Sequence, residues 1–444
     1  MDFFRNSKVF NSMIFKVNNQ EKYNKERFYG AYIHALRKYY EVSQKDLAKS
    51  IHVSNSTLCK MESGQQNMDM EAFDHAIQYF EKHDFDYHFN RNISKLEEAE
   101  RWIDRCLQEF VNLSYTNSLN EIKHYLENEE NEHSIAYFHY KIIESFYNLF
   151  TKKGTMKDIE DIINTQYFAS DYYLAILYDL YGMIEDSADT EVIENQILFL
   201  QKAHSYTERI NRPDLSGLIE YHMIYRYDDL NEPLYAFDLV KTCINHLQLA
   251  GSYRRILTVQ MCEGILYKKL NIYTKAIDIY KKLANNIMQV NDPRIQKEIF
   301  DNFSWCEFMQ KNDKEAIKYA LISLETGSSF PDLYIVLAFS NYRLGQYEQA
   351  EQFAKEFIEK NLNSERAKFI GLFMQMLLDV LHNKQDISEQ EQKLISMLPK
   401  FRAVELEIPF YSLLVDYYRN QNNLEQVTIY QDQFIQYLLS NKIH

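Results

Sequence analysis

Glycine and proline are scarce in this chain, with 10 glycines and 6 prolines in 444 residues. Average usage is roughly 7% glycine and 5% proline, so few residues are available for tight turns. This scarcity argues against a β-rich or collagen-like fold and favours helices joined by short polar turns. The chain is also too long for one compact core, so we expect at least two domains or an extended repeat array.

Paired cysteines and long apolar runs are missing as well. The five cysteines are odd in number and none belongs to a CxxC pair, so we expect a reducing, cytoplasmic environment. The longest apolar stretches, 333–339 and 372–381, are too short to cross a bilayer, and we expect no membrane partner. Residues 1–27 lack the apolar core of a signal peptide and are predicted to form an N-terminal arm.

Sequence patterns that carry catalysis are also absent. There is no HExxH, GxxxxGK[ST], GxSxG or GxGxxG, and no Ser, His and Asp spacing implies a triad. The dense group His83, Asp84, Asp86 and His88 is interpreted as a solvated turn after a helix. We therefore predict that the protein is not an enzyme and holds no cofactor or metal ion.

The charge of the chain is unevenly distributed. The formal net charge is -15, yet residues 1–65 hold 11 Lys or Arg and only 6 Asp or Glu. A small basic head on a large acidic body suits contact with nucleic acid through the head alone.

Residues 28–83 are predicted to form a compact set of short helices. Ser43 opens an S-x-x-D signal, in which a hydroxyl caps the free N–H groups of the following helix. Ser54 caps the next helix, and Gly64 ends it. A fourth helix carries Phe73, Ile77 and Phe80 at helical spacing, an apolar stripe that faces a core.

This segment resembles the phage-repressor (Xre) helix-turn-helix family over about residues 30–80. The matching positions are Gly30, Leu36, Arg37, Ser43, Gln44, Leu47, Ala48, Val53, Ser54, Ser56, Thr57, Leu58, Met61, Glu62, Ser63 and Gly64. The resemblance implies binding to double-stranded DNA, with the helix after Ser54 lying in the major groove.

The resemblance also implies roles for individual residues. The implied DNA-binding positions are Gln44, Ser54, Asn55, Ser56, Cys59 and Lys60. Amides, hydroxyls and a lysine can pair with base edges, whereas Gln44 would meet a phosphate. Cys59 departs from the pattern, because a thiol is a poor hydrogen-bonding group. Arg37 and Glu62 match a structural ion pair.

From about residue 93 onward the pattern is helical and shows signs of repetition. Ala276, Ala316 and Ala350 mark a register, and the last two are 34 residues apart, the tetratricopeptide period. Small residues are needed where the two helices of a hairpin cross closely. We predict an all-α fold, with a helix-turn-helix domain followed by a tetratricopeptide-like right-handed α-solenoid.

The predicted domain limits follow from these patterns. They are the arm at 1–27, the helix-turn-helix domain at 28–85, a linker at 86–96 and the repeat domain at 97–444. Within the repeat domain, residues 97–210 are helical but cannot be placed in the repeat register.

An Xre-type head joined to tetratricopeptide repeats resembles the peptide-sensing regulators called the RRNPP family (Rgg, Rap, NprR, PlcR and PrgX types). The resemblance implies a homodimeric transcription regulator controlled by a short signalling peptide in the groove of the repeats. The groove-facing candidates for peptide binding are Tyr221, Tyr225, Asn302, Trp305, Tyr342 and Arg343. The alternative is a Rap-type interaction module that sequesters a regulatory protein partner, either a response regulator or a phosphotransferase.

Overall fold

The computed structural model describes residues 25–84, 87–92, 94–163, 170–187, 189–287, 292–400 and 404–440. Within these ranges the regular structure is helical, apart from one isolated bridge between Asn90 and Ser134. The predicted all-α class is therefore confirmed. Most of the predicted arm (residues 1–24) and Asp86 lie outside the described residues.

The chain divides into two units. The first comprises 1–230 with 241–255, and the second comprises 231–240 with 256–444. The domain limits that we drew from the sequence remain predictions.

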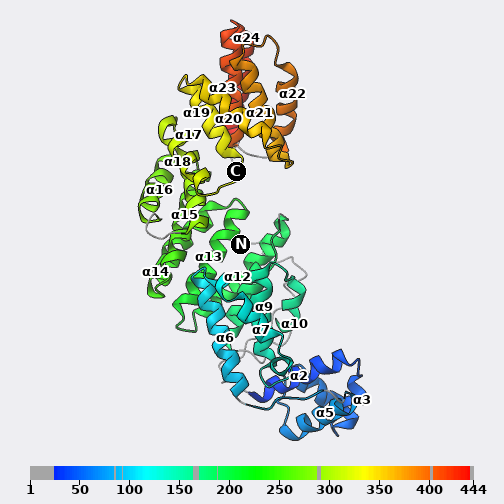
Figure 1. Ribbon diagram of the computed structural model, residues 1–444. Helices are drawn as coiled ribbons and strands as arrows, with labels where there is room; N and C mark the ends of the chain where they lie inside the picture. Colours follow the sequence, from blue (N-terminus) through cyan, green and yellow to red (C-terminus); the bar gives the residue numbers. More distant parts are fainter. Residues whose placement is uncertain are drawn as a thin grey trace. The chain divides into compact units, whose positions relative to one another are not determined.

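The first unit begins with a four-helix head (Figure 1). Its helices are α2 (Lys25–Tyr39), α3 (Gln44–Ser50), α4 (Asn55–Glu62) and α5 (Met70–His83). Both predicted caps are present, because Ser43 Oγ accepts a hydrogen bond from Asp46 N at 3.1 Å and Ser54 Oγ accepts one from Thr57 N at 2.9 Å. A short turn joins the two capped helices.

Aromatic residues pack the head against the segment that follows it in the first unit. The hydroxyls of Tyr32 and Tyr87 lie 2.6 Å apart, and the Tyr32 ring lies 5.2 Å from the ring of Tyr137. Asn90 N also donates to His133 O at 2.8 Å. The head is thus joined by side-chain packing, and not by the chain alone, to the helices behind it.

Helical hairpins make up the rest of the first unit. Its elements are α6 (Ser94–Val111), η2 (Tyr115–Asn117), α7 (Leu119–Leu126), α8 (Glu129–Glu132), α9 (Tyr137–Thr151), α10 (Met156–Ile163), α11 (Asp171–Met183), α12 (Thr190–Thr207), α13 (Pro213–Asp229) and the end of α14 (Pro233–Leu249). The buried Arg255, at the start of α15 (Tyr253–Lys269), donates to the carbonyl of Val111 at 3.2 Å and so caps the end of α6.

The second unit continues with paired helices. After the first part of α14 and most of α15 come α16 (Tyr273–Ile287), α17 (Pro293–Met309), α18 (Asp313–Glu325), α19 (Asp332–Arg343), α20 (Tyr347–Glu359), α21 (Glu365–Leu381), α22 (Ser388–Met397), η4 (Leu398–Lys400), α23 (Val404–Asn420) and α24 (Leu424–Ser440). Among the described residues, no helix combines the length and hydrophobicity that a membrane span requires.

A recurring turn explains the alanine register in the second unit. The turns inside its successive hairpins each contain a residue with positive φ: Asn271, Lys311, Gly345, Asn383 and Asn422. Ala276, Ala316 and Ala350 each lie five residues after one of these turn residues and are 0% exposed. Small residues such as alanine suit the place where the two helices of a hairpin cross closely. The turn residue and the buried alanine together mark three of these hairpins.

Candidate nucleic-acid interface

The outward face of α4 is polar and open, whereas its inward face is fully packed. Asn55, Ser56, Cys59 and Lys60 are exposed. The intervening Leu58 and Met61 are 0% and 2% exposed and belong to the core of the head. The helix therefore presents to solvent the four residues that the sequence places outward, next to its capped N-terminal turn.

The buried carboxylate of Glu62 lies at the centre of a hydrogen-bond network. Arg37 donates to it twice, from Nε to Oε1 at 2.7 Å and from Nη2 to Oε2 at 2.8 Å. Gln44 Nε2 also donates to Oε2 at 2.9 Å, and His34 Nδ1 lies 3.0 Å from the same oxygen. The structure brings Arg37 and Glu62 together as an ion pair, and it adds two partners that the sequence did not reveal.

These contacts control the charge of Glu62. Burial alone would raise the pKa of its carboxyl group, but the hydrogen bonds from Arg37, His34 and Gln44 outweigh burial and lower that pKa to about 2. Glu62 is therefore ionised at neutral pH. The ion pair fixes α2 against α4, and it holds one N–H of the Gln44 carboxamide at the start of α3.

Gly30 allows α2 and α4 to approach so closely. A Cβ atom at this position would lie 2.1 Å from the backbone oxygen of Met61. Only glycine fits at that distance, which accounts for its place in the helix-turn-helix pattern.

A cleft of about 940 Å³ lies between this network and α9. From the head it is lined by Ala31, His34, Ala35, Lys38, Gln44, Cys59, Glu62 and Ser63, and from α9 and α10 by Tyr137, Phe138, Lys141, Glu144, Asn148 and Ile162. Two of the predicted DNA-binding residues, Gln44 and Cys59, thus face the helices that follow the head. The sequence could not show this, because α9 lies about 80 residues farther along the chain than α4.

Two of the predicted peptide-binding residues lie on α13 in the first unit. Tyr221 is half-buried, and the guanidinium of Arg255 lies 4.6 Å from the centre of its ring. Tyr225 is 38% exposed and is the more accessible of the two.

The other four candidates lie in the second unit, and their side chains already have structural roles. Asn302 accepts a hydrogen bond from Lys268 Nζ at 2.9 Å and donates to Glu298 O at 2.9 Å. Trp305 is 5% exposed and packs in the core against Phe308, contrary to its expected place on a groove surface.

Tyr342 and Arg343 are the last two of these candidates. The half-buried ring of Tyr342 stacks on Phe339 at 5.5 Å. Arg343 pairs with Asp313, Nε to Oδ1 at 2.9 Å, and its Nη2 donates to Phe308 O at 3.0 Å. A peptide role for any of the six residues remains a prediction, and for Trp305 and Arg343 it would require existing contacts to break.

Within the described ranges, no group of three or more His, Cys, Asp or Glu residues has an arrangement that could hold a metal ion.

Comparison with known proteins identifies the repeat architecture. No protein-family model matches the chain. Regulatory protein RapD of Bacillus subtilis (strain 168) is 21% identical over 267 residues, which are 58% of this chain and 74% of RapD. The structure of apo RapI matches with a TM-score of 0.59 and 16% identity, over 79% of this chain and 98% of RapI.

A second structural match supports the same architecture. The apo form of the quorum sensor NprR from B. thuringiensis matches with a TM-score of 0.56 and 16% identity, over 77% of this chain and 99% of NprR. At this level of identity the likeness establishes the fold alone, and it confirms the predicted tetratricopeptide-like helical-repeat architecture.

Proposed function

We propose that the protein is a transcription regulator that binds DNA through its Xre-type head and is controlled by a short signalling peptide bound to its helical repeats. The observation that carries the DNA-binding part is the outward face of α4. Asn55, Ser56 and Lys60 are exposed together on a capped helix that the Arg37–Glu62 pair holds in place.

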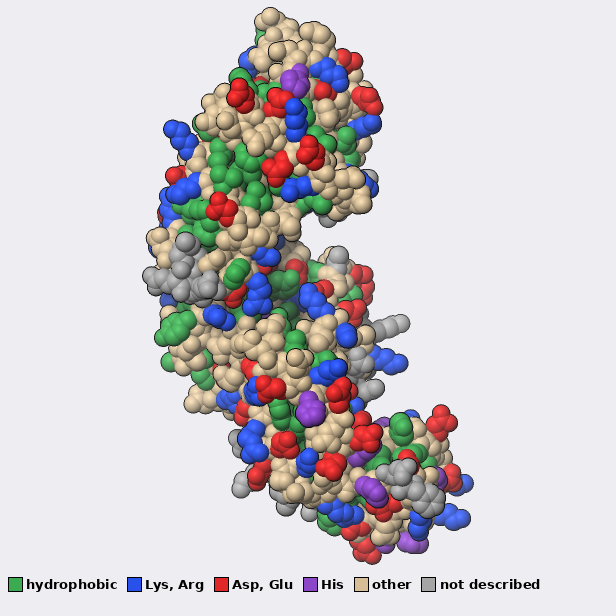
Figure 2. All heavy atoms as spheres, viewed as in Figure 1, with side chains coloured by type: hydrophobic (Ala, Val, Ile, Leu, Met, Phe, Trp, Pro, Cys, Tyr) green, Lys and Arg blue, Asp and Glu red, His purple; other side chains and the backbone are tan. Residues whose placement is uncertain are grey.

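The chemistry of this face suits a DNA duplex. Amide and hydroxyl groups can read base edges in the major groove, and lysine can pair with guanine or phosphate. The positive N-terminal end of α3 and its Gln44 amide suit a phosphate. On the face drawn in Figure 2, positive and negative side chains are interspersed, so the net charge of -15 does not form one repelling patch there.

The peptide part of the proposal rests on the repeat fold. The chain shares this fold with NprR, which is described as a quorum sensor. The predicted homodimer would place two heads on the two half-sites of a palindromic operator. Ligand binding would then act by favouring one arrangement of the repeats over another.

The first experiment is selection of genomic fragments by the full-length protein, with and without spent culture medium of its host. We expect a short palindromic site to be enriched, and the medium to change that enrichment. Double substitution Asn55→Ala and Lys60→Ala should abolish enrichment, whereas Lys82→Ala, an exposed lysine on α5, should not. Absence of enrichment with the unaltered protein would refute DNA binding.

The similarity to RapD and RapI favours a second candidate function, a Rap-type module that sequesters a response regulator or a phosphotransferase. Binding of such a partner through the repeats should survive the double substitution in α4. This candidate would be supported over the first if the unaltered protein and the double variant captured a partner equally well and the DNA selection failed.

A further inference from the structure

Glycines inside helices can mark positions where a neighbouring residue leaves no room for a side chain. In four of the five (Gly30, Gly182, Gly217 and Gly264), an added Cβ would lie 2.1–2.8 Å from a neighbouring atom. Gly371 in α21 is the exception, because its nearest neighbour would be Phe357 Cε1 at 4.0 Å. Glycine weakens a helix relative to alanine, and internal packing does not require it at this position.

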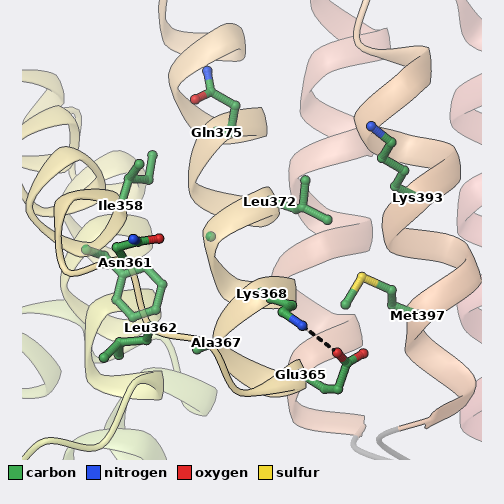
Figure 3. A pocket seen from close by; sticks show the side chains of 12 residues that line it. Ile358, Asn361, Leu362, Glu365, Ala367, Lys368, Leu372, Gln375, Lys393 and Met397 are labelled. Atoms are coloured by element: carbon green, nitrogen blue, oxygen red, sulfur yellow. Dashed lines mark hydrogen bonds and ion pairs between the residues drawn. The ribbon is translucent and has the colours of Figure 1, made fainter.

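Gly371 lies on the wall of a pocket of about 580 Å³ between α20, α21 and α22 (Figure 3). The pocket is lined by Phe357, Ile358, Asn361, Leu362, Glu365, Ala367, Lys368, Gly371, Leu372, Gln375, Lys393 and Met397. Glu365, Lys368 and Gln375 are the exposed residues of α21, so this helix is most open to solvent along the pocket. The volume of the pocket lies within the range of roughly 300–1,000 Å³ that is typical of small-molecule sites.

The charges around the pocket are compensated locally. Lys368 Nζ lies 2.9 Å from Glu365 Oε1 on the same helix, as Figure 3 shows, and Lys393 Nζ lies 2.7 Å from Glu389 Oε1. Each lysine therefore has a carboxylate one helical turn away. No net charge remains to attract an ion, so the rim favours an uncharged ligand.

The remaining surface of the pocket is apolar with two carboxamides at its edges. Ile358 and Leu362 are 37% and 43% exposed, and Leu372 and Met397 are half-buried. Figure 3 shows Asn361 just after α20 and Gln375 on α21. Gln375 makes one long hydrogen bond, to Asp379 at 3.3 Å.

We infer that this pocket is a binding site for a small, uncharged and largely apolar molecule that lies over Gly371. The missing side chain leaves room for the ligand to reach the backbone of α21. The apolar residues Ile358, Leu362, Leu372 and Met397 cover its body, and the carboxamide of Asn361 or Gln375 bonds a hydroxyl or carbonyl group at its edge. The site is separate from α4 and from the predicted peptide-binding residues, so it does not depend on the proposed function.

The test uses the neutral fluorescent probe N-phenyl-1-naphthylamine with the full-length protein. We expect saturable binding at one site. Gly371→Leu fills the pocket and should weaken binding at least tenfold. Gln352→Leu is the matched control, since it adds the same side chain at an exposed position of α20 outside the pocket, and it should leave binding unchanged.

A second variant covers the case in which Gly371→Leu fails to fold, as judged by circular dichroism. Leu362→Asp changes a half-exposed residue and adds an uncompensated charge at the rim, so it should also weaken binding of the neutral probe. Absence of saturable binding to the unaltered protein would overturn the inference. Equal affinity of the unaltered protein, a folded pocket variant and the control would overturn it too.

Discussion

Nδ1 of His246 lies 2.8 Å from Oε2 of Glu220, a carboxylate that is only 2% exposed. His204 Nε2 approaches the other oxygen, Oε1, at 3.3 Å. Three helices of the first unit, α12, α13 and the end of α14, thus meet at one buried carboxylate. An anion at this depth is stable only if cations or hydrogen bonds compensate it.

This arrangement predicts that stability depends on pH. The hydrogen bond from His204 to Glu220 raises the pKa of the imidazole above its usual 6.5, more than burial lowers it, and Glu208 adds to the rise. A raised pKa in the folded state stabilises the protein fully below pH 6.5, and that stabilisation is lost as pH rises through the folded-state pKa. We expect the Tm to fall as the pH is raised from 6.5 toward 8.

Thermal melts at constant ionic strength measure this effect. Glu220→Gln removes the charge and should flatten the pH dependence of Tm over that range. His124→Asn, which removes an exposed histidine on α7, should leave the dependence unchanged. A dependence that is the same in the unaltered protein and in Glu220→Gln would rule out this carboxylate as its source.

The ion pair in the head gives a second prediction. Removing one partner of a buried pair typically costs about 3–5 kcal/mol, because the other charge is left uncompensated. For Arg37→Ala we expect about 3 kcal/mol, since Gln44 and His34 still contact Glu62. Faster hydrogen exchange at the amides of α2 and α4 would report the loss, and Lys38→Ala, at an exposed neighbour, should have little effect. Unchanged exchange in Arg37→Ala would contradict the structural role of the pair.

Local signals made the head predictable from the sequence. Ser43 and Ser54 act on the backbone within three residues, and the side of α4 that faces inward follows from its periodicity. The repeat register could be predicted for a similar reason, because close helix crossings admit only small residues such as Ala316 and Ala350.

The residues that face the groove could not be predicted from such local signals. Residues 332–341 of α19 are buried on every side, so periodicity cannot separate a groove face from a core face. The same holds for α17, where residues 303–308 are all buried and Trp305 is a core residue. Lys268, which donates to Asn302, and the two histidines that contact Glu220 lie 16 to 34 residues from their partners, and these contacts depend on how whole helices pack.

The surroundings of Gly30 and Gly371 predict opposite effects of a glycine-to-alanine substitution. At Gly30 an added methyl group would clash with the backbone at 2.1 Å, so Gly30→Ala should destabilise the head. At Gly371 the nearest atom would be 4.0 Å away, and Gly371→Ala should stabilise α21 by about 0.5–1 kcal/mol through the higher helix propensity of alanine. Thermal unfolding compares the two variants directly. A lower Tm for Gly371→Ala would mean that this glycine has a structural role that its surroundings do not reveal.

The last prediction concerns Lys60 and rests on the proposed DNA binding. A lysine that contacts a phosphate releases a counterion, so its loss reduces the slope of log affinity against log salt by about 0.9. A lysine that reads a base should instead lower affinity for the selected site and relax the preference at one base pair, by roughly 1–3 kcal/mol. Fluorescence anisotropy of Lys60→Ala at several salt concentrations, with the selected site and with single-base variants, separates these roles. If affinity, slope and preference all match those of the unaltered protein, Lys60 does not contact the duplex, and the orientation of α4 on DNA must differ from the one proposed.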